Sequence, residues 1–158
     1  MKLTSSAFKD GATIPSLYTC EGNAFNPPLE FHSVPKESIS LVLIMDDPDV
    51  PTSVRPDQMW DHWVIFNIPP SVTSIKEHST PPGVQGKNTG GQNRYYPPCP
   101  PDREHRYFFK LYALDKKLHL KEGATKSEVE KAMIGHILVE AELIGKYERI
   151  KKHRCGCC

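Results

Sequence analysis

Hydrophobic stretches alternate along the chain with short polar or proline-rich breaks, and this pattern predicts a sheet. The segment 38–45 is nearly continuous hydrophobe with several β-branched residues, which is typical of a strand buried on both faces. The segments 63–68 (WVIFNI) and 105–114 (HRYFFKLYAL) predict two further strands, the second rich in aromatic residues. Four shorter or alternating segments are also expected to be strands: 2–8, 16–20, 29–31 and 139–147.

One helix is expected late in the chain. Thr125 and Glu128 have the spacing of a capping box, in which each residue satisfies a free backbone N–H of the other. The positions that then recur at helical intervals are Val129, Ala132, Met133 and His136. The fold class is therefore mostly β (β-rich α+β), with a single domain over 1–150 and a mobile, cysteine-rich tail over 151–158.

Charge and composition exclude several classes of protein. The 20 Lys+Arg residues nearly balance the 19 Asp+Glu residues, and the short basic stretch 146–154 is the sole exception to an even distribution, so we expect no nucleic-acid partner. No apolar run approaches the roughly 20 residues that a membrane span requires. The first residues lack the apolar core of a signal peptide, so a cytoplasmic protein is expected, and its five cysteines are expected to be thiols.

Three carboxylates follow the segment 38–45 within four residues: Asp46, Asp47 and Asp49. Charges this close repel unless a cation or a hydrogen-bond donor lies among them. One interpretation is an aspartate-nucleophile phosphatase, with Asp47 as nucleophile and Asp49 as acid. That chemistry needs Mg²⁺ bound at a parallel α/β sheet. The chain has too few predicted helices for such a sheet and places Pro48 between the two aspartates, so we reject this interpretation.

Two other kinds of site are rejected as well. His62 and nearby carboxylates have the chemistry of a metal site, and the segment 153–158 (HRCGCC) gathers one histidine and three cysteines. An isolated terminal cluster lacks the second pair of ligands of a structural zinc site. The loop PPGVQGKNTGG resembles a phosphate-binding P-loop, but Pro81 and Asn88 stand where that motif requires glycine and serine or threonine. We therefore expect no metal and no nucleotide cofactor.

Three polar segments remain as a candidate site: D-P-D at 47–49, W-D-H-W at 60–63, and a proline-rich run that leads into H-R-Y, 97–107. Each lies at the end of a predicted strand or in the long loop 79–104. Loops of this length inside a compact domain are usually functional. We therefore expect these segments to meet at one rim of the sheet.

The chemistry expected at this rim is a carboxylate–imidazole pair. A carboxylate that accepts a hydrogen bond from a histidine fixes its tautomer and favours its charged form. Asp47 or Asp49 is therefore expected to hold His62 or His105, which then offers an N–H to an anion. Two aromatic side chains are expected to form the walls: Trp60 and Tyr107.

The same segments are similar to the motifs of a known family. They contain D-P-D-x-P at 47–51, H-W-V-x-x-N-I-P at 62–69, and P-C-P-P followed by H-R-Y within 98–107. With these motifs the chain resembles the phosphatidylethanolamine-binding proteins, also called Raf-kinase-inhibitor-like proteins, and most closely their short prokaryotic branch. The likeness extends from about Leu3 to Arg149.

The resemblance implies a β-sandwich-like fold of mostly antiparallel strands with peripheral helices. It also implies a small pocket that binds phosphate or phosphorylated head groups, with no cofactor and no metal. Carried over position by position, it implies these ligand-binding residues: Asp47, Asp49, Trp60, His62, Pro98, Cys99, Pro100, His105 and Tyr107. The partners that the resemblance implies are a phosphorylated small molecule or lipid head group, a protein partner that the chain regulates, and a second copy of the chain in a homodimer.

Two positions depart from the family pattern. Pro98 stands where glycine is usual and has no N–H to offer a phosphate. Arg103, near a frequent glycine, adds a charge that could replace that donor. The leading hypothesis is a non-enzymatic binding module. The alternatives are a hydrolase-like enzyme that uses the same His/Asp pocket with Cys99 as candidate nucleophile, and an interaction protein whose apolar strand face forms a homodimer.

Overall fold

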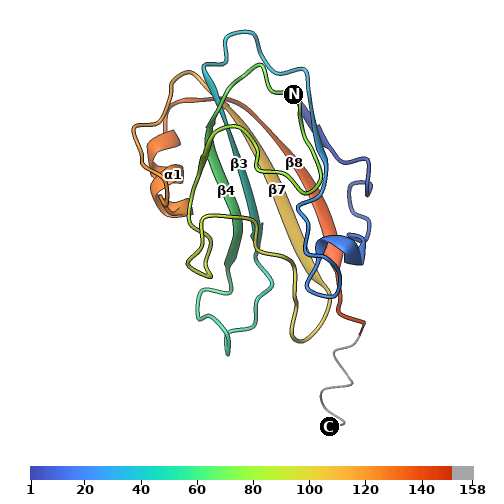
Figure 1. The fold of residues 1–158 in the computed structure, drawn as a ribbon. Helices are drawn as coiled ribbons and strands as arrows, with labels where there is room; N and C mark the ends of the chain where they lie inside the picture. Colours follow the sequence, from blue (N-terminus) through green and yellow to red (C-terminus); the bar gives the residue numbers. More distant parts are fainter. Residues whose placement is uncertain (151–158) are drawn as a thin grey trace.

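The protein is built from two antiparallel sheets, seen in a computed structural model that describes residues 1–150 (Figure 1). Within these residues, the larger sheet has five strands in the order β6-β4-β3-β7-β8, and the smaller has the order β1-β2-β5. The strands of the larger sheet are β3 (Ser40–Asp47), β4 (Trp60–Ile68), β6 (Val84–Gln85), β7 (His105–Leu114) and β8 (Ile137–Tyr147). Those of the smaller sheet are β1 (Lys2–Thr4), β2 (Leu29–His32) and β5 (Ser74–Ile75). The tail expected over 151–158 lies outside the described residues.

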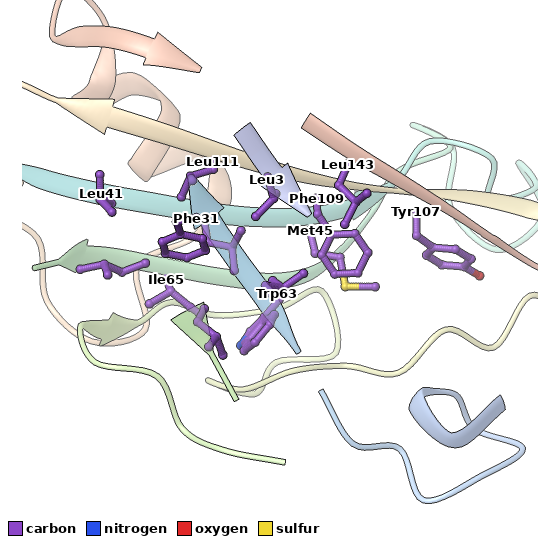
Figure 2. Close-up of a cluster of buried hydrophobic side chains, with 14 of the residues drawn as sticks. Leu3, Phe31, Leu41, Met45, Trp63, Ile65, Tyr107, Phe109, Leu111 and Leu143 are labelled. Carbon is purple, nitrogen blue, oxygen red and sulfur yellow. The ribbon is translucent and has the colours of Figure 1, made fainter. Parts of the chain in front are cut away.

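Strand β3 is buried on both faces, as its unbroken hydrophobic sequence predicts. On one face, Leu41, Leu43 and Met45 join the main core between the two sheets (Figure 2). On the other face, Val42 and Ile44 belong to a second buried cluster that includes side chains from the α-helix. Burial of each of these aliphatic side chains stabilises the fold by about 1.5–3 kcal/mol. A shift of one residue would move every side chain of β3 to the opposite core, so the packing on both faces fixes the register of the larger sheet.

Helix α1 (Lys126–Met133) covers the second face of the larger sheet (Figure 1). Its N-terminus is closed by the predicted capping box, in which Glu128 N donates to the Thr125 hydroxyl and Thr125 N donates to the Glu128 carboxylate. The helix buries Val129 and Met133 and ends one turn earlier than the helical pattern indicated.

Two predicted strands near the N-terminus are corrected by the structure. The segment 16–20 is not a strand, because Pro15 leads into a 3-10 helix, Ser16–Tyr18, that buries the Tyr18 ring. The strand expected over 2–8 ends at Thr4, where β1 loses its partner β2. Short segments carry too few residues for periodicity to distinguish a strand from a single turn.

The expectation that all cysteines are thiols is wrong for Cys20 and Cys99. These two residues form a disulfide across 79 positions of sequence, with Cα atoms 5.4 Å apart. The turn after the 3-10 helix brings Cys20 against the proline-rich loop, and Cys20 N donates a 3.1 Å hydrogen bond to the carbonyl oxygen of Pro98. The sequence spacing gave no sign of this pairing, since only the fold brings the two segments together.

The predicted rim exists at one end of the larger sheet. Because neighbouring strands are antiparallel, the end of β3 lies beside the starts of β4 and β7. The register pairs Asp47 with Trp60 and Asp46 with Phe108. In residues 1–150, no helix has the length and apolar character needed to cross a membrane.

Candidate functional site

A small pocket of about 230 Å³ opens at this rim. It draws side chains from the ends of β3, β4 and β7 and from the two loops that follow β3 and precede β7. Its lining residues are Asp47, Val50, Val54, Trp60, His62, Tyr96, Cys99, Pro100, Pro101, His105 and Tyr107. This volume lies below the roughly 300–1,000 Å³ that is usual for ligand pockets, so the pocket has room for a small ligand only.

His105 lies between two carboxylates. Its Nδ1 is 2.6 Å from Asp47 Oδ2 and its Nε2 is 2.6 Å from Asp102 Oδ1. Because ionised carboxylates only accept hydrogen bonds, both ring nitrogens donate and the ring is an imidazolium. Burial alone would lower the pKa of His105, but the hydrogen bonds and charges of Asp47 and Asp102 outweigh burial and raise that pKa above 6.5. His105 therefore has no N–H left for a ligand.

His62 is held by the backbone instead. Its Nδ1 is 2.7 Å from the carbonyl oxygen of Tyr96, which can only accept, so Nδ1 carries the proton. Burial lowers the pKa of His62 from 6.5 to about 4 despite this hydrogen bond. Within residues 1–150, no group is hydrogen-bonded to His62 Nε2. At neutral pH this atom is thus an unprotonated acceptor that remains for a ligand, rather than the N–H donor that we expected.

Aromatic rings surround the two histidines. The Tyr107 ring lies edge-on to His62, with ring centroids 5.2 Å apart, and it stacks on His105 at 6.4 Å. Trp60 and Tyr96 are packed together at 5.3 Å. The indole N–H of Trp60 is buried and has no partner among the described residues. This N–H is covered by protein, although other atoms of Trp60 line the pocket.

The three clustered aspartates have separate partners. Asp46 accepts from Lys126 at 2.8 Å and from Lys110 at 3.1 Å on the helix side of the sheet. Asp49 accepts two hydrogen bonds from the Arg106 guanidinium and one from its backbone N–H, which hold the pKa of Asp49 below its ordinary value. Asp47 alone faces the pocket. Alternation along β3 and a turn after it explain why neighbouring carboxylates do not share one site.

Seven of the nine predicted site residues line the pocket: Asp47, Trp60, His62, Cys99, Pro100, His105 and Tyr107. The other two do not. Asp49 is turned toward Arg106, and Pro98 is buried with its carbonyl oxygen bonded to Cys20 N. Arg103 is mostly exposed and reaches back to the carbonyl oxygen of Asp49 at 3.4 Å.

Sequence reasoning missed several residues of this site. Asp102 lies three positions before His105, and its carboxylate could have been suspected from that spacing. Tyr96 acts on His62 through a backbone carbonyl, a function that leaves no signature in residue type. The remaining missed residues are small apolar wall positions: Val50, Val54 and Pro101.

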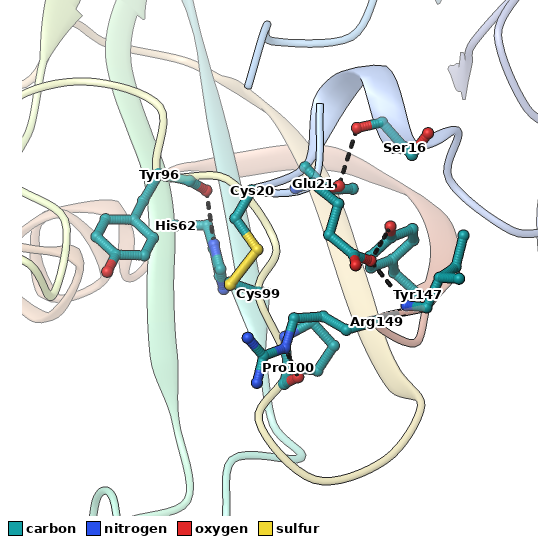
Figure 3. Close-up of a disulfide and its surroundings, with 11 residues drawn as sticks. Ser16, Cys20, Glu21, His62, Tyr96, Cys99, Pro100, Tyr147 and Arg149 are labelled. Carbon is teal, nitrogen blue, oxygen red and sulfur yellow. Dashed lines mark hydrogen bonds between the residues drawn. A yellow bond between two sulfur atoms is a disulfide. The ribbon is translucent and has the colours of Figure 1, made fainter. Parts of the chain in front are cut away.

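The disulfide borders the pocket on the side of the proline-rich loop (Figure 3). While Cys99 is bonded to Cys20 it has no thiolate, which removes it as a nucleophile. On the far side of the same loop, Arg149 Nε donates to the carbonyl oxygen of Pro100 at 2.9 Å. Among residues 1–150, no group of three or more His, Cys, Asp or Glu side chains is arranged to hold a metal ion.

The family can now be assigned. The sequence model of the phosphatidylethanolamine-binding protein family matches residues 4–148. The chain belongs to this family. Its resemblance to the family, drawn from three motifs, is thereby confirmed, as is the mostly β fold.

Other members of the phosphatidylethanolamine-binding protein family share sequence and structure with this chain over nearly its full length. A UPF0098 protein of Chlamydia trachomatis is 52% identical over 149 residues, which cover 94% of this chain and 99% of the relative. A UPF0098 protein of Methanothermobacter thermautotrophicus is 51% identical, with coverage of 94% and 99%.

Two solved structures also match. The structure of CT736 from Chlamydia trachomatis, described as a homologue of this family, has a TM-score of 0.92 at 51% identity and covers 94% of this chain and 97% of its own. YbcL of E. coli, described as a member of the mammalian family, has a TM-score of 0.84 at 29% identity, with coverage of 94% and 98%. The two-sheet architecture is therefore that of this family.

Proposed function

We propose that the pocket binds a small phosphate-like anion or a phosphorylated head group, and that the ligand must carry a proton on one oxygen. The observation that carries this proposal is the fixed tautomer of His62, whose Nδ1–H is used by Tyr96. A bound P–OH group donates a hydrogen bond to His62 Nε2. An anion with no proton can only accept hydrogen bonds, so its oxygen is repelled by the lone pair of Nε2. The site thus selects a protonated oxyanion rather than any anion.

The other polar groups near the pocket restrict which ligand can bind. The Trp60 N–H has no partner in the described part of the chain, but it is covered by protein and reaches a ligand only if the indole ring moves. The His105 imidazolium and its two carboxylate partners, Asp47 and Asp102, together carry a net negative charge, which disfavours a fully ionised anion more than a ligand that keeps a proton. Arg103 does not line the pocket, but its side chain is 60% exposed next to Asp102, so it is the cation that could turn toward a bound anion.

Binding is favoured over catalysis because the thiol that was the candidate nucleophile is not free, and because burial raises the pKa of the Tyr107 hydroxyl, which makes it harder to ionise. A hydrolase that used His62 as general base would need a hydroxyl, thiol or positioned water to activate. Cys99, the candidate thiol of the pocket, is engaged in the disulfide. Regulation of a protein partner, homodimer formation and a cytoplasmic location stay predictions from the resemblance and the sequence.

The proposal is tested with two anions of similar size that differ in one proton. At neutral pH inorganic phosphate keeps a P–OH group, whereas sulfate has none. We expect saturable NMR shifts of His62 and His105 with phosphate and no saturation with sulfate at the same concentration. In His62→Ala the phosphate response is lost, and in His119→Ala, an exposed control, it is retained.

Phosphoethanolamine provides a second arm of the same experiment. A phosphomonoester loses its last acidic proton with a pKa of about 6. Its affinity is expected to fall about tenfold for each pH unit above that value, because one proton must be taken up on binding. Equal binding of phosphate and sulfate, or undiminished binding by His62→Ala, would overturn the proposal. If His62→Ala does not fold, the comparison of the two anions on the unaltered protein still decides it.

A further inference from the structure

A second cavity, of about 810 Å³, lies beside the small pocket and plays no part in the proposed function. Its lining comes from two strands and three loop segments: Trp63 of β4, Gln85 of β6, and residues 23–26, 78–81 and 92–97. Within residues 1–150, Tyr96 alone lines both cavities. The volume lies within the roughly 300–1,000 Å³ that is usual for ligand pockets, so the second cavity has room for a larger ligand than the small pocket.

Two buried asparagine side chains hold the walls of the second cavity in place. The Oδ1 atom of Asn26 accepts a hydrogen bond from Ser79 N at 2.8 Å, which joins the first loop segment to the second. Asn88 donates to the carbonyl oxygen of Arg94 at 2.8 Å and accepts from Gln92 N at 3.1 Å, which fixes the third segment. The cavity is therefore preformed, and a ligand that enters it does not have to order these loops.

Aromatic rings form the apolar part of the lining. Trp63 is almost fully buried and lies edge-on to Tyr95, with ring centroids 5.3 Å apart. In the first two loop segments, the rings of Phe25 and His78 pack together with centroids 4.0 Å apart. Three of the lining rings are only half-buried, those of Phe25, Tyr95 and Tyr96. The lining therefore offers apolar ring surface against which the C–H groups of a ligand can pack.

The polar groups of the lining are nearly all uncharged. Among the described residues that line the second cavity there is no Asp or Glu, and Arg94 is the one Lys or Arg. The side chains of Asn23 and Asn93 are exposed, and within residues 1–150 neither makes a hydrogen bond. Each carboxamide offers both donors and an acceptor. A cationic ligand would find no counter-charge here, and an apolar ligand would cover these amides without giving them a partner.

We propose that the second cavity binds a neutral, polyhydroxylated ligand of the saccharide class. Each sugar hydroxyl both donates and accepts, so a pair of neighbouring hydroxyls matches the donor and acceptor of a carboxamide such as Asn23 or Asn93. The C–H face of the sugar ring packs on the half-buried aromatic rings. An extended peptide fits less well, because it needs a free strand edge. The outer edge of β6 is already taken, since Gly123 N donates to the carbonyl oxygen of Gln85 at 3.0 Å.

The test titrates neutral sugars (glucose, galactose, mannose, maltose and cellobiose) into the full-length protein and follows the indole N–H resonances by NMR. Trp63 lines the second cavity and Trp60 lines the small pocket, so the resonance that moves identifies the cavity that is occupied. The variant Trp60→Phe assigns the two signals. We expect at least one sugar to give a saturable shift at Trp63 that exceeds any shift at Trp60. Acetyl-trialanine-amide, a neutral peptide without hydroxyl groups, should give no saturable shift.

Two variants at exposed positions test the carboxamides, Asn23→Ala and Asn93→Ala. Each should weaken binding of the best sugar about fivefold, which corresponds to the loss of one hydrogen bond. His119→Ala, exposed and outside the cavity, should leave the affinity unchanged. The proposal is overturned if no sugar gives a saturable shift, if Trp60 responds more than Trp63, if the peptide binds equally well, or if both asparagine variants bind undiminished. The samples contain no phosphate, so these outcomes are independent of the anion proposal.

Discussion

Asp47 and His105 form a 2.6 Å ion pair between two side chains that are almost fully buried, with exposed fractions of 4% and 1%. The pair joins the end of β3 to the start of β7 and so fixes one corner of the pocket. The second ring nitrogen of His105 is bonded to Asp102, whose side chain is 39% exposed. The two carboxylates therefore make hydrogen bonds of equal length to His105, but one is buried and the other is partly exposed. Removal of the buried charge should change the pKa of His105 more than removal of the exposed one.

We predict that Asp47→Asn lowers the pKa of His105 and that Asp102→Asn lowers it less. An amide keeps the shape but removes the charge, and a charge in a buried position is screened less by water. Chemical shifts of the His105 ring followed against pH measure both changes. A larger drop in Asp102→Asn would show that the exposed carboxylate controls this histidine.

His105 also gives stability a defined pH dependence. Its pKa is raised in the folded protein, so its contribution is fully present below pH 6.5 and is lost as pH rises through the folded value. In Asp47→Asn this loss should move to lower pH. Unfolding by urea at a series of pH values above 6.5 checks the direction.

We predict the opposite sign for His62. Its pKa falls from 6.5 to about 4 on folding, so the unfolded chain binds more protons in this range. The contribution of His62 is fully present above pH 6.5, and about 3 kcal/mol is lost as pH falls toward 4. In His62→Gln the free energy of unfolding should therefore depend less steeply on pH between these values.

The control for this prediction is the same replacement at the exposed His119. That variant should keep the acid-side loss of the wild-type protein, because its side chain is not buried by folding. Urea midpoints at pH 7 and at about pH 4.5 compare the three proteins. Parallel profiles for wild type and His62→Gln would mean that other groups cause the acid loss.

Asp46 provides a third prediction, away from the pocket. Its carboxylate is 1% exposed and is paired with Lys126, 10% exposed, and Lys110, 28% exposed. Lys126 also lies 3.4 Å from Asp61, whose pKa is raised by burial. We expect Lys126→Met to cost about 3 kcal/mol of unfolding free energy, because it leaves buried negative charge with a weaker partner.

Lys110→Met is the matched comparison, since the same substitution removes the more exposed partner of the same carboxylate. It should cost about 1 kcal/mol or less, because water screens that pair. Denaturant unfolding of both variants at one pH gives the difference. If the two losses were equal, burial of the lysine would not be what determines the strength of the pair.

Most of the sheet could be predicted from the sequence because long segments carry an unambiguous pattern. Strands β3, β4, β7 and β8 follow from runs of six to ten residues, and the capping box located α1. The segment 16–20 was misassigned because Pro15 dictates a turn that five residues of pattern cannot overrule. Local signals thus identified the elements and failed where the element was short.

The site was predictable in composition but not in its chemistry. Motifs at three strand ends identified seven lining residues, because antiparallel pairing brings those ends to one rim. His62 donates its Nδ1–H to the backbone carbonyl oxygen of Tyr96. Every residue has such a carbonyl, so the residue types in the sequence could not reveal which nitrogen of His62 carries the proton. The Cys20–Cys99 bond likewise depends on a tertiary contact across 79 residues, and composition alone pointed to thiols.

This long separation supports the last prediction. A crosslink that closes a loop of about 80 residues restricts the unfolded chain, and loss of such a crosslink costs roughly 2–4 kcal/mol. The double variant Cys20→Ser/Cys99→Ser should lose that amount in denaturant unfolding and stay folded, since the loop keeps its hydrogen bonds from Arg149 and, through backbone atoms, from residue 20. Excess reductant should shift the midpoint of the wild-type protein to that of the double variant and leave the double variant unchanged. A wild-type midpoint that does not respond to reductant would mean either that the bond resists reduction or that it adds nothing to stability. Alkylation of Cys20 and Cys99 in the same reduced sample distinguishes these two outcomes, and full alkylation with no shift would contradict the prediction.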